Sequence, residues 1–108
     1  MKNYHLKDKK ITILKNTNKR DEYGEIINEL TPVYENIWAY YRQASGNEMY
    51  LALQTNTRIE AIFEIEWIKS LESNMVIRYM GQDYSISRID DYEGGKNSLR
   101  MYAYKYEG

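Results

Sequence analysis

The side chains that could do chemistry in this sequence are mostly carboxylates. The 108-residue chain has 16 acidic residues, 15 basic residues, one histidine and no cysteine. The histidine, His5, lies in the lysine-rich start of the chain, with no second imidazole or thiolate to complete a metal site or a nucleophile–base pair. Because some acidic pair is unavoidable among so many carboxylates, a pair alone does not indicate glycosidase chemistry. We therefore expect no catalytic residue, no metal site and no cofactor.

Three stretches resemble functional motifs without matching them. The glutamates of segment 60–66 alternate with apolar residues, which places them on the solvated face of a strand. Asp90 and Asp91 lack the spacing of a calcium-binding loop. Segment 94–98, GGKNS, lacks the first glycine of a phosphate loop and precedes a strand instead of a helix. We interpret it as a hairpin loop.

Tyrosine is unusually frequent in this sequence, with twelve tyrosines against one phenylalanine. A tyrosine combines a large apolar ring with a hydroxyl that needs a partner, which suits half-buried contacts between subunits. The alternative is that these residues are ordinary strand formers on a solvated face. Tyr102, Tyr104 and Tyr106 could also form a stacking platform for nucleic acid. The net charge of −1 provides no basic field for that role. A small barrel that binds nucleic acid or a peptide is therefore kept only as the alternative function.

The length and composition predict one globular domain over residues 1–108, with residues 1–9 as a mobile N-terminal arm. Hydrophobic residues make up 43% of the chain and charged residues 29%, which excludes a disordered protein. The absence of cysteine excludes disulfides. No apolar run approaches the length that spans a bilayer, and the charged start lacks the apolar region of a signal peptide. We expect synthesis in the cytosol and no membrane partner.

Alternating apolar residues predict six short strands and one helix. Ser45 and Glu48 have the spacing of a capping box, which starts a helix near Gly46 that ends at Gln54. Glycine at the end of Asp21–Gly24 predicts a turn. The predicted strands cover residues 10–15, 37–42, 59–67, 75–79, 83–89 and 99–106.

Finer details of these strands also follow from the pattern. Within segment 59–67 the odd positions should face the core and the glutamates should face the solvent. Ile89 falls out of phase with Tyr84 and Ile86, which predicts a bulge or a strand end near Arg88. Pro32 should lie just before the second strand, and segment 16–30 shows no sustained period. An antiparallel barrel and a sandwich both fit these elements.

The sequence resembles a known family at several points. Trp38-Ala39, then Ser45-Gly46 and Glu48 before a short helix and an alternating strand, are similar to phage head–tail joining, or head-closure, proteins of the connector and stopper type. The 20–24 loop and the 79–82 hairpin are similar as well, so the resemblance covers roughly residues 6–106. It implies an all-β fold, a small antiparallel six-stranded β-barrel with one short helix inserted between the second and third strands.

The resemblance also implies a function and partners. Such a protein forms a ring in the neck of a tailed phage or prophage, between the portal or adaptor protein and the tail or tail-terminator protein. It closes the DNA-filled head and gives the tail a docking surface. Copies of the chain would contact each other, double-stranded DNA would pass without specific binding, and the protein would lie in the host cytoplasm during assembly. The candidate interface residues are Asp21, Glu22, Tyr23, Gly24, Glu48, Tyr50, Tyr102, Tyr104 and Tyr106.

Overall fold

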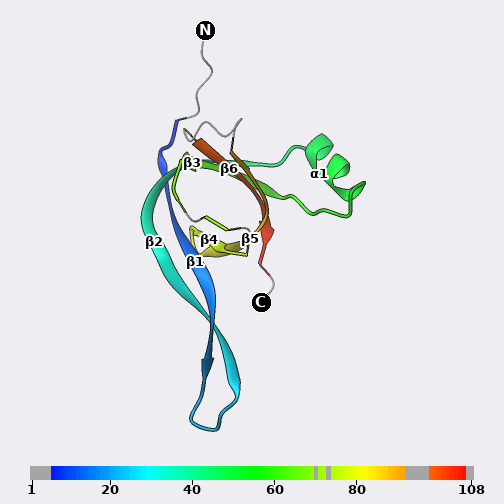
Figure 1. The fold of residues 1–108 in the computed structure, drawn as a ribbon. Coiled ribbons are helices and arrows are strands. Elements are labelled where there is room, and N and C mark those ends of the chain that lie inside the picture. Colours follow the sequence, from blue (N-terminus) through cyan, green and yellow to red (C-terminus); the bar gives the residue numbers. More distant parts are fainter. Residues whose placement is uncertain (1–5, 70, 73, 92–97, 107–108) are drawn as a thin grey trace.

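A computed structural model describes residues 6–69, 71–72, 74–91 and 98–106 of the chain (Figure 1). These residues form six strands and one helix. In chain order the elements are β1 (Lys9–Arg20), β2 (Ile26–Gln43), α1 (Gly46–Leu53), β3 (Ala61–Glu66), β4 (Val76–Tyr79), β5 (Gln82–Asp91) and β6 (Ser98–Lys105).

The strands close into one barrel in the order β1-β2-β3-β6-β5-β4, with β4 returning to β1. Every neighbouring pair is antiparallel. The prediction of an all-β, six-stranded antiparallel barrel with a short helix is confirmed. Closure pairs the strands along the barrel wall on both sides, which removes the open edges that a small sandwich would leave.

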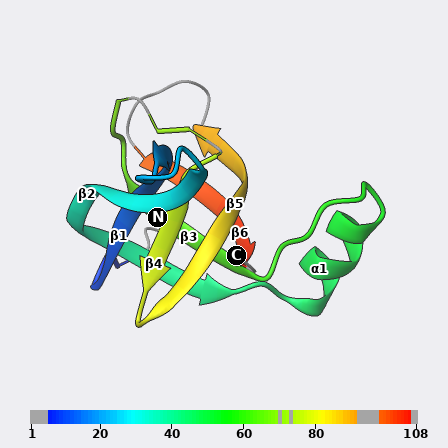
Figure 2. The same cartoon turned by 90° about the horizontal axis from the view of Figure 1, so that it is seen from below.

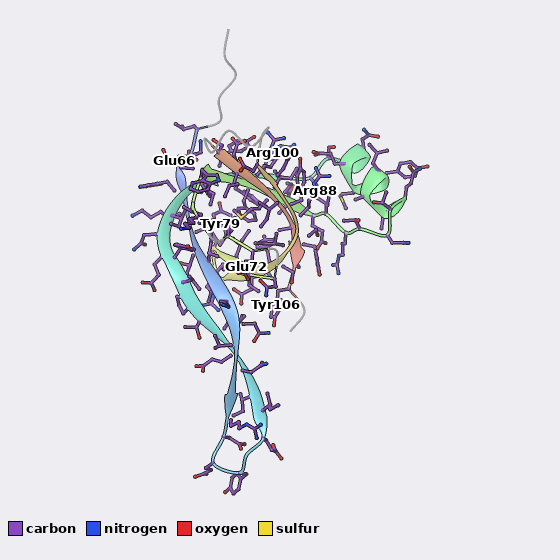
Figure 3. The ribbon with its side chains drawn as sticks, viewed as in Figure 1. Glu66, Glu72, Tyr79, Arg88, Arg100 and Tyr106 are labelled. Atoms are coloured by element: carbon purple, nitrogen blue, oxygen red, sulfur yellow. The ribbon has the colours of Figure 1, made fainter. Side chains whose placement is uncertain are left out.

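The core fills the barrel with apolar side chains from all six strands. Phe63 is fully buried, and its ring lies within 6 Å of the rings of Tyr41, Tyr79 and Tyr84, centroid to centroid. Figure 3 shows Tyr79 inside the barrel. Leu99, Met101 and Ala103 of β6 alternate into the same core, as their spacing predicts.

Strands β1 and β2 extend well beyond the barrel as a two-stranded hairpin, which we call the arm (residues 15–31; Figure 1). Its ladder continues to the pair Arg20↔Ile26, so β1 runs well beyond the predicted strand 10–15 although segment 16–30 shows no sustained period. Pro32 lies inside β2 and not before it. A missing amide is tolerated there because β2 has only β1 beside it at this point.

Two register shifts bend β2 from the arm into the barrel wall. The pairs Ile11↔Ile37, Ile13↔Tyr34 and Leu14↔Pro32 show that β2 carries one extra residue at each step. Asn36, within the first shift, has a positive φ of 57°. Such bulges sharpen the bend and twist of a strand, which lets one continuous β2 serve both the barrel and the arm.

The outer face of β3 differs from the prediction. Glu64 is only 6% exposed, and Ile62 beside it is fully buried, so the glutamates of this strand do not all face solvent. The reason is that β3 lies between two strands, and the long side chains of Tyr40 on β2 and Arg100 on β6 flank Glu64. The ends of the predicted strand, Ile59 and Trp67, are only partly buried.

The remaining predictions concern the last two strands and the loops. A register shift between Ile86 and Arg88 confirms the bulge. Strand β5 runs on to Asp91, beyond the end of the predicted strand 83–89. Positions 92–97 and His5 lie outside the described residues, and of the predicted N-terminal arm the structure describes only residues 6–9, with Lys9 already in β1.

Candidate interaction surfaces

The described residues hold no group of three or more histidine, cysteine, aspartate or glutamate side chains that could bind a metal ion. Within the same residues, no helix is long and apolar enough to span a bilayer. The candidate functional features described below are surfaces: the tip of the arm, helix α1 and the tyrosines of β6. Figure 2, which views the molecule at right angles to Figure 1, shows α1 standing away from the barrel wall.

The tip of the arm is a tight turn built by Asp21. Its carboxylate Oδ1 accepts hydrogen bonds from the amides of Tyr23 at 2.9 Å and Glu25 at 2.8 Å. Gly24 takes a φ of 81°, which other residues adopt only with strain. Asp21 and Gly24 thus build the turn, which leaves Tyr23, 83% exposed, and the exposed Glu22 as the side chains available to a partner.

Helix α1 begins with the predicted capping box. The Glu48 amide donates to Ser45 Oγ at 3.1 Å, and the Ser45 amide donates to Glu48 Oε1 at 2.9 Å. The structure adds a contact that the sequence does not indicate. Arg42 at the end of β2 donates to both carboxylate oxygens of Glu48, at 2.6 and 2.9 Å. Glu48 is therefore a residue that attaches the helix to the barrel, and only secondarily a candidate for partner contacts.

The electrostatics of this attachment are strong for a surface pair. The hydrogen bonds from Arg42 and from the Ser45 backbone lower the pKa of the Glu48 carboxyl to about 2. The same pairing raises the pKa of Arg42. Both charges are held at neutral pH, and a bidentate geometry of this kind fixes orientation as well as distance. The start of α1 consequently has one defined position relative to β2.

Most of the apolar surface of α1 is exposed. Ala52 is its one buried residue, whereas the other apolar side chains face outward. Met49 and Leu53, one turn apart on the helix, are both exposed. An exposed apolar face on a short helix is a feature typical of a contact surface. The exposed apolar residues are Met49, Tyr50, Leu51 and Leu53.

The tyrosines of β6 lie on the outer face, each partly buried. The Arg88 guanidinium lies 4.5 Å from the centre of the Tyr102 ring, and that of Arg58 lies 5.5 Å from the centre of the Tyr104 ring. Cation–π contacts of this kind attract each guanidinium to the face of its ring. Tyr106 follows the end of β6, and its amide donates to the Asp83 carbonyl at 2.9 Å.

The arginines of this face are paired with carboxylates. Arg58 lies 3.1 Å from Glu60, Arg88 lies 3.9 Å from Asp90, and Arg100 lies 3.4 Å from Glu64. The Lys105 amide also donates to Glu60, and this bond, followed by the one from Arg58, lowers the pKa of Glu60. Cations already neutralised in this way have little charge left for phosphates, which counts against a nucleic-acid platform.

The structure brings some of the predicted residues together and separates others. Glu48 and Tyr102 line one groove of about 440 Å³ between α1 and the barrel, together with Arg88 of β5. The arm tip, in contrast, lies at the far end of the molecule from α1 (Figure 1). The candidate residues therefore form two separate surfaces, one on the barrel side with α1 and one at the arm tip.

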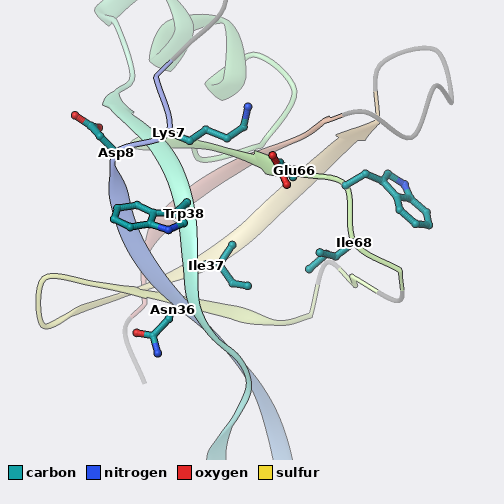
Figure 4. Close-up of a pocket in the computed structure, with 8 residues that line it drawn as sticks. Lys7, Asp8, Asn36, Ile37, Trp38, Glu66 and Ile68 are labelled. Atoms are coloured by element: carbon teal, nitrogen blue, oxygen red, sulfur yellow. The ribbon is translucent and has the colours of Figure 1, made fainter.

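A third surface was not predicted from the sequence. A cleft of about 680 Å³ opens where β2 bends into the barrel (Figure 4). The indole of Trp38 is 54% exposed beside it, with the Lys10 ammonium 4.8 Å from the ring centre. The sequence does contain one sign of this cleft, because Trp38 occupies the outward position next to the buried Ala39. An apolar residue at such a position, however, is equally typical of an ordinary strand. The lining residues are Lys7, Asp8, Asn36, Ile37, Trp38, Glu66, Trp67 and Ile68.

The fold has a counterpart among solved structures. The solution structure of protein SF1141 from Shigella flexneri 2a matches with a TM-score of 0.73 and 18% sequence identity, covering 92% of this chain and 92% of that chain. At this identity the likeness concerns the fold alone. A comparison with curated protein sequences gave no match.

A family profile described as "Phage head completion protein" matches residues 1–105. The match includes the barrel, the arm and α1, so it is not confined to one motif. It also agrees with the family resemblance that Trp38-Ala39, the capping box and the alternating third strand carry. The chain belongs to the phage head completion protein family.

Proposed function

We propose that this chain is a structural component of a tailed-phage neck, where copies form a ring between the portal or adaptor protein and the tail. The observation that carries the proposal is the family match over residues 1–105. Membership of that family supports a structural role in head closure for a virion-associated protein. The ring, its place in the neck and its contact with the tail are the finer steps that we add.

The arrangement of surfaces supports a ring. A cyclic ring needs a heterologous contact, in which two different patches of one copy meet their counterparts on its neighbours. The barrel provides a closed, rigid body, and the arm and α1 project from it in different directions (Figures 1 and 2). One molecule can therefore reach a neighbour and a second partner at once.

The proposed partners are further copies of this chain, the portal or adaptor protein on one side, and the tail or tail-terminator protein on the other. Double-stranded DNA would pass through the ring without specific binding, which the net charge of −1 favours because like charge discourages adhesion. The role depends on interface geometry and not on bond chemistry. The proposed location is the virion neck, after assembly in the host cytoplasm.

Deletion of the gene from its phage or prophage tests the proposal. We expect heads that package DNA but neither retain it nor acquire tails, and we expect a plasmid copy of the wild-type gene to restore tailed particles. Light scattering of the purified protein, alone and with the portal assembly, would show whether it joins a ring. Infectious, tailed particles from the deletion strain would overturn the proposal.

A further inference from the structure

The two strands of the arm each have one open edge. Strand β4 pairs with β1 only from Thr12 to Leu14, and β3 pairs with β2 only from Ala39 to Gln43. Among the described residues, β1 after residue 14 and β2 before residue 39 therefore pair with no strand but each other. Each open edge presents backbone N–H and C=O groups in the spacing that another strand can pair with.

These two edges carry opposite charge. Strand β1 contains five basic residues and no acidic one, among them Lys15 and Arg20 in the arm. The following segment, residues 21–41, contains five acidic residues and no basic one, among them Glu25 and Glu29. An arm that is basic along β1 and acidic along β2 complements a second arm placed beside it, because the acidic strand of one then lies next to the basic strand of the other. Two edges of the same charge would repel each other.

The arm is also poorly covered as it stands. Ile26 and Ile27 project from opposite faces of β2, and both are exposed. A two-stranded hairpin is marginal in water, and a third strand is what usually stabilises it. A neighbour on each side would give every arm strand two partners and would cover part of these isoleucines.

We propose that neighbouring copies of this chain join through their arms, with the open edge of β2 in one copy pairing antiparallel with the open edge of β1 in the next. This inference rests on the proposed ring and names the contact between its subunits. The contact is heterologous, and such a contact generates a ring where the rotation between copies closes. Since β1 and β2 are antiparallel within one arm, arms that point the same way generate a continuous antiparallel sheet.

The pairing has an expected register. Within one arm Lys15 pairs with Thr31, Thr17 with Glu29 and Arg20 with Ile26. In a ring without axial rise the next copy's β1 lies at the same height, so Glu29 faces Thr17 of the neighbour. Pro32 lacks an amide and ends the row of donors, which limits the contact on β2 to residues 26–31.

Cysteine cross-linking in assembled particles tests the register. Because the chain has no natural cysteine, only the introduced cysteines of this chain can form the disulfide. Thr17→Cys and Glu29→Cys are made as separate single variants, so no bond can form within one chain. Both are expressed together in the producing host, and purified tailed particles are oxidised. We expect a dimer band roughly tenfold stronger in the mixture than with either variant alone, because a disulfide needs Cα atoms within about 7 Å. A mixture of Thr17→Cys with Tyr50→Cys, on α1, should give no such band.

Charge reversal provides a second test that does not depend on the register. Lys15→Glu with Arg20→Glu makes both edges acidic, and Glu25→Lys with Glu29→Lys makes both edges basic. Each double variant alone should lose incorporation into particles, whereas the two expressed together should regain it by alternating. If the charges mattered only within one arm, mixing would restore nothing.

The outcomes separate the two proposals. If both cysteine variants enter tailed particles but the mixture does not cross-link, the arm contact is overturned and the ring stands. If either variant alone gives as strong a dimer as the mixture, the contact is isologous and the inference also fails. If neither the variants nor the wild-type chain is found in particles, the proposed function falls and the arm contact falls with it.

Discussion

Arg42 and Glu48 form the pair on which the position of α1 depends. The two hydrogen bonds from Arg42, with those from Ser45, lower the pKa of Glu48 from its ordinary value of 4.5 to about 2. A carboxyl with a lower pKa in the folded state stabilises the fold above its unfolded pKa and loses that contribution as the pH falls through the folded one. The contribution should therefore be complete at pH 7 and should disappear between about pH 4.5 and 2.

Glu48→Gln tests this pair. Because the Glu48 side chain is 31% exposed, solvent screening reduces the expected cost at pH 7 to about 1 kcal/mol. The difference between the variant and the wild type in the free energy of unfolding should narrow as the pH falls from 4.5 to 2. Urea unfolding followed by circular dichroism measures it. Glu66→Gln, an exposed change at the end of β3, is the matched control. A loss of stability in Glu48→Gln that is equal at neutral and acid pH would show that the ion pair is not the source of that loss.

Phe63 is the residue on which the core depends. It is fully buried and contacts the rings of three tyrosines, so its removal leaves a cavity that those rings cannot fill. Phe63→Ala should cost about 3–5 kcal/mol, a large part of the stability of a domain this size. Phe63→Leu, which keeps most of the volume, should cost less than about 1.5 kcal/mol. An unchanged melting temperature in the alanine variant would refute the register of β3.

At the scale of the element, the strands of the barrel could be predicted and the arm could not. Alternating apolar and polar residues indicate a strand with one buried face, and β5 and β6 both show this pattern. The break in the pattern near Arg88 also predicted the bulge of β5. The arm has two wet faces, so its ladder leaves no period of two in segment 16–30. The capping box was readable because it is local, whereas its contact with Arg42 depends on the tertiary fold.

The candidate surfaces were limited by the same distinction. Tyr102, Tyr104 and the 21–24 turn were found because residue type and local pattern mark them. Their grouping could not be predicted, because only the closed barrel puts Tyr102 beside α1 and leaves the turn at the end of a long arm. The cleft beside Trp38 was missed for a related reason: it exists because of the bend at Asn36, which no local pattern announces.

The arm should be dispensable for folding. None of its residues belongs to the core cluster, which β1 joins only through Ile11 and Ile13. Replacing residues 16–30 with Asn-Gly joins Lys15 to Thr31 through a two-residue turn of the type that suits a hairpin. We expect a barrel whose melting temperature changes by only a few degrees, because the replaced residues contribute nothing to the core cluster. The shortened protein should nevertheless fail to complement a deletion strain.

A control separates length from sequence in that experiment. Gly24→Ala keeps the arm but strains its turn, because Gly24 has a φ of 81°. It should lower complementation less than the truncation does. A truncated protein that unfolds would show that the arm supports the barrel, and one that complements fully would exclude the arm from every essential contact.

At the scale of the whole molecule, the charge pattern counts against a nucleic-acid-binding barrel. The net charge is −1, and the arginines that flank the outer tyrosines each lie beside a carboxylate. Binding that does not depend on sequence requires cations free to replace the counterions of the phosphates. This molecule combines aromatic rings with cations that its own carboxylates already neutralise.

Duplex DNA should therefore bind no more tightly than about 10⁻⁵ M near physiological salt, measured by anisotropy of a labelled duplex. A variant with Glu60→Gln and Asp90→Asn supplies the matched control, because it removes the partners of Arg58 and Arg88 and raises the net charge by two. Its affinity should rise, and the rise should vanish as salt is added. Sub-micromolar binding by the wild-type protein would instead favour the nucleic-acid barrel. In that event Tyr102 and Tyr104, each in contact with an arginine, would be the first residues to replace.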